Sequence, residues 1–272
     1  MFAVPRLRYE TDLSDLEWLL LEPLIPAAKS GGRARDTDMR EVMNGIFYLL
    51  RVGGAWSLLP HDFPPHPTVY GYFNAWRKSG VQQSMNDALR TAVREQAERA
   101  EEISAGIIDS QSVKTTSAAK EDRGFDAGKL ISGRKRFILV DVLGLILHVF
   151  VTKASLPERK GAQELLKGTS AEILKQLQLI WADGGYGGPD FTAWVLENYD
   201  IFVEIVKRTD DVKGFVILPR RWVVERTFSW FGKFRRLSKD YEVYAQTTAA
   251  LIYTAMVRIM LQRLARDSAL FC

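Results

Sequence analysis

Apolar positions recur every three to four residues through the first hundred residues of the chain. This helical spacing marks the segments 12–26, 38–51, 68–80 and 81–102. An Asp/Ser pair opens the first segment as a capping signal, a proline ends it, and Thr68 is a candidate cap for the third segment. The pattern predicts a helical N-terminal region.

The segments 68–80 and 81–102 predict a helix, a compact turn and a second helix. Aromatic and basic side chains crowd this stretch, and such an arrangement is typical of a helix-turn-helix that binds DNA. The alternative is a group of helices packed around their own aromatics. Under the first interpretation the candidate DNA-binding residues are Tyr70, Tyr72, Trp76, Arg77 and Lys78.

From residue 103 onward the pattern changes to short β-branched runs. Three strands come first, and Gly144 joins the second to the third as a hairpin; helices then alternate with strands. This order predicts an α/β (α+β) fold, a mixed sheet with flanking helices in the ribonuclease-H-like arrangement. We therefore expect a helical DNA-binding domain at 1–102 and a catalytic domain at 103–272. The expected strands cover 104–113, 135–144, 145–154, 177–183 and 200–208, and the expected helices 161–177, 189–199, 219–237 and 247–268.

Composition narrows the class of protein. The 272 residues carry a net charge of +4, a weak indication of a polyanionic partner. The single cysteine, Cys272, excludes a disulfide framework within one chain and fits a reducing cytoplasm. The N-terminal stretch lacks a signal-peptide pattern, and the apolar runs are shorter than the roughly 18 residues of a membrane span. We expect a cytoplasmic protein without a membrane segment, and the lack of a phosphate-binding glycine loop predicts no nucleotide cofactor.

Two aspartates stand where buried strands end. Asp109 ends the run GIID, and Asp183 ends LQLIWAD just before the glycines of GGYGG. The first and fourth strands can be parallel neighbours, so these two ends could adjoin. The other interpretation is that each aspartate simply terminates its strand or caps the next helix.

A third acid, Glu225, lies in the basic and aromatic segment 219–237. It follows Arg221 by one helical turn, so a surface salt bridge is the plain alternative. The apolar residues of the segment predict a helix that packs on the sheet and turns the acid toward the strand ends. Basic residues here and around the polar 114–135 loop are candidates for DNA phosphates: Lys129, Arg134, Lys135, Arg136, Arg221, Arg226, Lys233, Arg235 and Arg236.

Other titratable residues have weaker claims. Asp141, near the hairpin, rivals Asp109 as a metal ligand, while Asp122 and Asp126 are expected to be solvated in the polar loop. We expect His148 to be packed within its strand, and His61 and His66 to be structural in a proline-rich turn.

Several motifs in this order resemble the bacterial insertion-sequence transposases of the DDE superfamily, in particular the compact group with a helical N-terminal region and no large catalytic-domain insertion. They are IIDSQSV, GRKRFILVDVLGLILHVFVTKA, WADGGYGG and RRWVVERTFSWFGKFRRLSKDYE, and the resemblance extends over nearly the whole chain. It implies that Asp109, Asp183 and Glu225 form the acidic triad. The triad would hold two Mg²⁺ ions, for which Mn²⁺ can substitute.

The resemblance also implies a signature of Tyr, Arg, Glu and Lys around the third acid. Arg221 and Glu225 match its spacing, but Leu218 stands at the tyrosine position and Gly232 at the lysine position, with Lys233 adjacent. The 41 residues between Asp183 and Glu225 leave little room for an inserted domain.

The implied activity is transposition. The protein would bind the terminal inverted repeats of its own element, cut there, and join the ends to target DNA as a homodimer or higher oligomer. Two alternatives stay open: a plain metal-dependent nuclease on the same fold, and a DNA-binding repressor derived from a silenced transposase.

Overall fold

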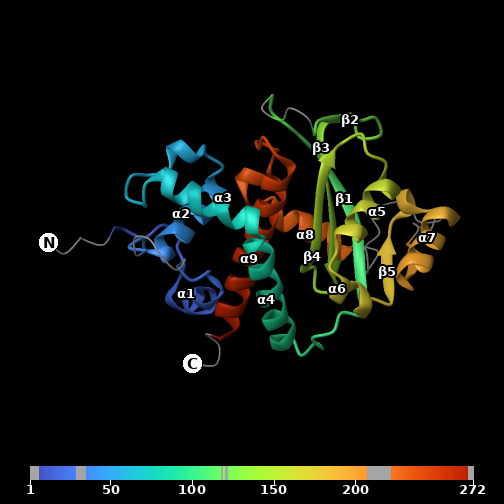
Figure 1. The fold of residues 1–272 in the computed structure, drawn as a ribbon, viewed down its shortest axis with the longest axis horizontal. Coiled ribbons are helices and arrows are strands. Elements are labelled where there is room, and N and C mark those ends of the chain that lie inside the picture. The colour runs from blue at the N-terminus through green and yellow to red at the C-terminus, as the bar shows by residue number, and fades with distance from the viewer. Residues whose placement is uncertain (1–5, 29–34, 118, 120–121, 207–221, 269–272) are drawn as a thin grey trace.

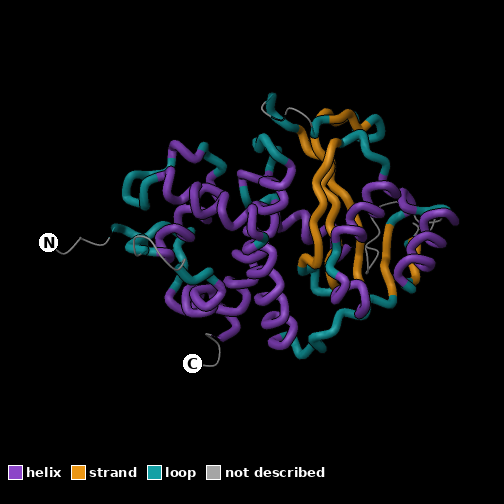
Figure 2. The backbone as a smooth tube through the Cα atoms, in the orientation of Figure 1, coloured by secondary structure: helices purple, strands orange, loops and turns teal. Residues whose placement is uncertain are grey.

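The computed structural model describes residues 6–28, 35–117, 119, 122–206 and 222–268. Helices gather at one end of the molecule and a mixed sheet with its own helices forms the other (Figures 1 and 2). The long C-terminal helix lies between them, beside the last of the N-terminal helices. This is the predicted order of a helical region followed by a ribonuclease-H-like sheet.

The N-terminal helices begin at sequence-coded caps. Ser14 and Glu17 form a capping box at the first helix, and the Asp38 carboxylate caps the second. The third helix corrects our expectation, because it begins two residues before Thr68 with Pro67 in its first turn, where a missing N–H breaks no bond. These helices are α1 (Asp15–Leu21), α2 (Met39–Val52), α3 (His66–Ser79) and α4 (Val81–Gln96), with 3₁₀ turns at Glu22–Leu24 and Trp56–Leu58.

Among the described residues the sheet has the order β2-β3-β1-β5-β6, and β4 also pairs with β3. The strands β1, β3 and β4 form an antiparallel meander, whereas β1, β5 and β6 run parallel. The loop expected at 114–135 contains β2 and the start of β3, which the residue pattern did not predict. The strands are β1 (Ala105–Lys114), β2 (Gly124–Asp126), β3 (Ile131–Asp141), β4 (Ile146–Lys153), β5 (Leu179–Ala182) and β6 (Phe202–Ile205).

Helices cover both faces of the sheet. One face, that of Ile108, packs against α5 (Glu158–Gly168), α6 (Ala171–Gln176) and α7 (Pro189–Tyr199). The opposite face, that of Ile107, packs against α8 (Trp222–Phe231) and α9 (Ala245–Ser268). The single helix predicted over 161–177 is divided into α5 and α6, because Ser170 caps a new helix two residues after α5 ends.

The C-terminal helix α9 belongs to the core of the N-terminal helices. It contacts α1, α2, α3 and α4 as well as β4. Its buried Met256 and Met260 share one apolar cluster with Phe47 and Phe73. The division into domains at 102/103 remains a prediction. No helix in the described ranges is long and apolar enough to cross a bilayer.

Gly161 and Gly71 provide a matched test of how closely helices approach the sheet. A Cβ at Gly161 in α5 would lie 1.9 Å from the Phe137 ring of β3, whereas one at Gly71 in α3 meets nothing within 4 Å. Gly161→Ala should therefore cost about 1–3 kcal/mol of unfolding free energy through overpacking. Gly71→Ala should stabilise the protein by about 0.5–1 kcal/mol, because alanine favours helix interiors. Urea unfolding measures both, and equal effects would contradict the close packing.

His148 is packed within β4, as the sequence predicts. Its Nδ1 lies 3.2 Å from the hydroxyl of Tyr253 on α9, and a Cβ on Gly168 would lie 2.6 Å from its Nε2. Burial lowers the pKa of His148 from 6.5 to about 4. The imidazole is therefore neutral in the folded protein at neutral pH.

The low pKa of His148 predicts acid sensitivity. The unfolded chain binds this proton near pH 6.5 and the folded chain only near pH 4, so acidification through that window favours unfolding. The stability that neutral His148 contributes is complete above about pH 6.5 and is lost toward pH 4. His148→Gln should flatten this part of the stability profile measured by urea unfolding. An unchanged slope between those pH values would contradict the assignment.

Candidate active site

The candidate site begins at two neighbouring parallel strands. Ile107 of β1 pairs with Trp181 of β5, and continuing this register by two residues brings Asp109 opposite Asp183. Both carboxylates are half-buried. The Oδ1 atom of Asp109 accepts the Ser110 N–H at 2.7 Å, and Oδ1 of Asp183 accepts the Gly185 N–H at 2.8 Å. The structure therefore confirms the alternative interpretation in which Asp183 acts as a cap, because it caps the short turn Gly184–Tyr186.

The buried Tyr186 shows how negative this end of the sheet is. Burial raises the pKa of its hydroxyl well above 10, and the negative charges of Asp109, Glu158 and Asp183 raise it further. Its hydroxyl lies 3.4 Å from Oε2 of Glu158. Three carboxylates thus act on one phenol beside the middle of β1 and the end of β5.

Glu158, in the first turn of α5, is a member of the site that sequence reasoning missed. Its carboxylate accepts the Ser110 hydroxyl at 2.7 Å and the Lys135 ammonium at 3.2 Å. The position of Glu158 at the start of α5 favours its negative charge, because a helix N-terminus stabilises an anion. The sequence signal was Pro157–Glu158, a helix start directly after the third strand of the meander.

Asp126 corrects the expectation of a solvated loop residue. It lies in β2, is buried, and accepts the Ser112 hydroxyl at 2.5 Å. Burial alone would raise the pKa of Asp126, but the Ser112 hydroxyl, the Lys129 N–H and the Lys135 ammonium outweigh it and lower the pKa to about 2. Asp122 is half-exposed, 3.9 Å from Arg134.

Asp141, the rival first acid, has a structural role. Its side chain is fully buried and ion-paired with Arg94 at 2.7 Å. Its Oδ1 also accepts the N–H groups of Leu143 and Leu145, which close the hairpin between β3 and β4. Both carboxylate oxygens of Asp141 are therefore bonded within the protein.

Glu225 lies on α8, whose position is fixed by the hairpin. Thr227 donates its hydroxyl to the Gly144 carbonyl at 2.8 Å, and Arg226 donates to the Leu143 carbonyl at 2.9 Å. The helix buries Val224 and contacts β1, while Glu225 is on its exposed side. Alternation along β1 puts Asp109 on the face of Ile107, which is the face that α8 covers.

The three acids do not form a closed ligand set. Among the described residues, no three His, Cys, Asp or Glu side chains are grouped so that they could hold one metal ion. The expectation that Asp109 ends its strand is wrong, because β1 continues to Lys114. Asp109, from within β1, and Asp183, directly after β5, are nevertheless oxygen donors from adjacent strands, which suits a hard divalent cation. The register of β1 and β5 relates the two aspartates, while Glu225 comes from α8, which contacts β1.

Several expected DNA-binding residues are buried instead. Arg134 bonds Asp240 at 3.0 Å, Arg136 donates to the Leu237 carbonyl at 2.7 Å, and Lys135 binds Glu158. Trp76 is buried in the core of the N-terminal helices. Because these side chains are withdrawn from solvent, we assign them structural roles.

The remaining candidates lie nearer the surface. Arg236 is ion-paired with Glu242 at 2.6 Å, and Arg226 lies between the rings of Trp222 and Trp230. Arg221 and Leu218 fall outside the described residues. The exposed or half-exposed candidates are Tyr70, Tyr72, Arg77, Lys78, Lys129, Lys233 and Arg235.

Comparison with known families gives two matches. Residues 100–260 match the family described as "Transposase DDE domain", and residues 13–86 match the one described as "Putative transposase of IS4/5 family". No curated protein and no solved structure matches the chain. The two matched segments cover the sheet with its helices and most of the N-terminal helices.

Glu158 and Glu164 on α5 provide a matched test of the site's framework. Glu158→Gln should cost about 1–3 kcal/mol of unfolding free energy, since it leaves the buried Lys135 and Ser110 without their anion. Glu164→Gln removes an exposed ion pair with Lys167 and should change stability by less than about 1 kcal/mol. Equal losses in urea unfolding would show that Glu158 is not a framework residue.

Proposed function

Because the chain belongs to the DDE transposases of the IS4/5 type, and is thus a polynucleotidyl transferase that acts in transposition, we propose that it cuts and joins the ends of its own insertion sequence. Its partners would be the terminal inverted repeats and a target duplex. The observation that carries the proposal is the parallel pairing of β1 with β5, whose continued register brings Asp109 opposite Asp183.

The family implies divalent metal ions, and we propose that Asp109, Asp183 and Glu225 hold them as two Mg²⁺ ions. Bound there, the metal would supply Lewis-acid chemistry at the scissile phosphate. The two aspartates are carried by adjacent paired strands, Asp109 within β1 and Asp183 directly after β5, and such rigid support is what precise ligand placement requires. The contact of α8 with β1 supports Glu225 as the third ligand, which would join the pair when DNA binds.

The proposed reaction has two steps. In the first, a water oxygen attacks the phosphorus at the element's end and the bond to the 3′ oxygen breaks, which leaves a free 3′-hydroxyl. In the second, that hydroxyl attacks a target phosphodiester, and the new bond replaces the target's own bond to its 3′ oxygen. Exposed cations near the site, such as Lys129, would contact the backbone and keep the reacting groups in line.

We further propose that the N-terminal helices contribute to recognition of the ends. The exposed or half-exposed Tyr70, Arg77 and Lys78 on α3 support this, as does the compact junction of α3 with α4 at Gly80. Joining two ends to one target also requires two sites, so the active form would be a homodimer or higher oligomer.

Substitution of the proposed ligands tests the reaction. Asp109→Asn, Asp183→Asn and Glu225→Gln should each lower Mg²⁺-dependent cleavage by at least about 100-fold, since the loss of second-shell partners alone costs about 10–100-fold. Binding of the same DNA in EDTA should remain. The substrate is DNA that flanks the coding sequence, and Glu172→Gln, an exposed acid on α6, is the control. Cleavage by Glu225→Gln at the wild-type rate would refute its role.

A strand-transfer assay with pre-cut ends separates transposition from simple cleavage. The proposal predicts products in which the donor 3′ end is joined to target DNA. Cleavage without joined products would identify a nuclease. Binding without cleavage by the wild-type protein would identify a repressor.

A further inference from the structure

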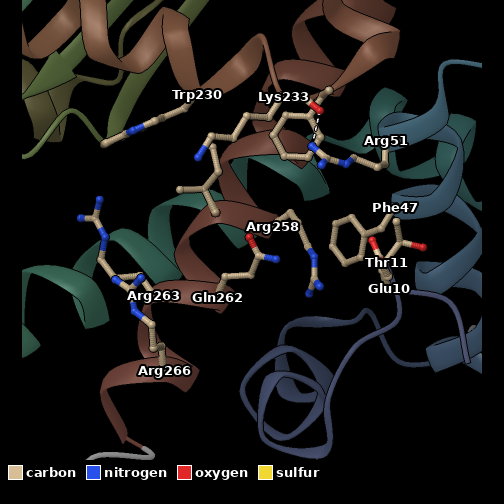
Figure 3. A pocket seen from close by; sticks show the side chains of 12 residues that line it. Glu10, Thr11, Phe47, Arg51, Trp230, Lys233, Arg258, Gln262, Arg263 and Arg266 are labelled. Atoms are coloured by element: carbon tan, nitrogen blue, oxygen red, sulfur yellow. Dashed lines mark hydrogen bonds between the residues drawn. The ribbon is translucent and has the colours of Figure 1, made fainter.

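A basic pocket lies between the N-terminal helices and the C-terminal helix. It has a volume of about 480 Å³ and receives side chains from the loop before α1, from α2, from the end of α8 and from α9 (Figure 3). Five basic side chains and one carboxylate, Glu10, line it. We call the set Arg51, Trp230, Lys233, Arg258, Arg263 and Arg266 the basic pocket.

Contacts within the protein already involve two of these basic side chains. Arg258 is buried and paired with Glu17 at 2.9 Å, and Arg51 donates to the Lys233 carbonyl. The Lys233 and Arg266 side chains are exposed at the rim, and Arg263 is half-buried beside them. Like charges gathered in one concave surface repel one another and attract a polyanion.

A second pocket of about 700 Å³ shows that an excess of basic side chains is not common to every large pocket of the described structure. It lies beside the start of α2 and is lined by three arginines and five carboxylates. An excess of carboxylates repels phosphate. The basic pocket is therefore the better site for an anion of these two large pockets.

The basic pocket continues along α8 toward Glu225. The guanidinium carbon of Arg226 lies 4.7 Å from the ring centroid of Trp222 and 4.9 Å from that of Trp230. The guanidinium carbon of Arg263 also lies near Trp230, 5.4 Å from its ring centroid. Burial lowers the pKa of Arg226, and the nearby Arg263 charge lowers it further. The rise from Glu225 to Trp230 is about 7.5 Å, which is about two nucleotides of one DNA strand.

We propose that the basic pocket binds phosphates of a DNA duplex a few nucleotides from the bond that is cut near Glu225. The inference rests on the proposed function and specifies a contact surface for it. In this arrangement α2, α8 and α9 hold one stretch of backbone together. The contact is to phosphate and is independent of base sequence.

The test compares two double variants with the same change in charge. Lys233→Gln with Arg266→Gln removes two exposed cations of the basic pocket. Lys167→Gln with Lys175→Gln removes two exposed cations of α5 and α6, on the opposite face of the sheet. The probe is a short fluorescein-labelled duplex of arbitrary sequence, and anisotropy in EDTA gives Kd without any reaction.

The pocket variant should bind about tenfold more weakly than the wild type, and the slope of log Kd against log[NaCl] should fall by about two, one for each lost phosphate contact. The control variant should keep the wild-type slope. Circular dichroism should show the same fold for all three proteins, because the substituted side chains are exposed.

Each outcome decides the question. Equal weakening by both pairs would mean a bulk-charge effect and would overturn the pocket, as would wild-type binding by the pocket variant. If the wild type binds no duplex at all, the proposed function fails together with the inference. If the salt slope falls for the pocket variant alone while Glu225→Gln still cuts DNA, the phosphate-binding role of the basic pocket is supported and the assignment of Glu225 as a metal ligand is refuted.

Discussion

Both faces of the sheet are buried, so each central strand must satisfy two apolar cores at once. Along β1, Ile107 enters the core shared with α8 and α9, and Ile108 enters the core shared with α5, α6 and α7. Such two-sided burial is typical of parallel and mixed sheets and allows few other registers. The positions of Asp109 within β1 and of Asp183 directly after β5 are set by this packing.

The helices on the two faces then supply different parts of the candidate site. From one side, α5 contributes Glu158, which binds Ser110 and Lys135 close to Asp109. From the other side, α8 contributes Glu225 on a helix that is bonded to the β3–β4 hairpin. Asp141 stabilises the hairpin itself through Arg94, so this buried ion pair indirectly fixes the helix that carries the third acid.

The sequence predicted the features that depend on neighbours along the chain. Apolar runs, helix caps and the hairpin at Gly144 are local, so the residue pattern alone predicted the strands that precede Asp183 and carry Asp109, although β1 continues beyond Asp109 to Lys114. The roles of Asp126, Arg134 and Arg136 depend on partners far away in the sequence: Arg134 binds Asp240, 106 residues on. A basic run in a polar segment therefore suggested DNA contacts where the protein uses the charges internally. Glu158 was missed for the same reason, because its three partners come from separate strands and a turn.

The position of α9 has a consequence for biosynthesis. The core of the first four helices is completed by residues 245–268, which are made long after those helices. The N-terminal helices emerge from the ribosome first but cannot bury their apolar faces until α9 follows, which makes this contact one of very long sequence separation. Stable packing of the helical region therefore waits for the translation of α9. A truncated product that ends before α9 exposes its apolar surface and becomes a substrate for proteolysis.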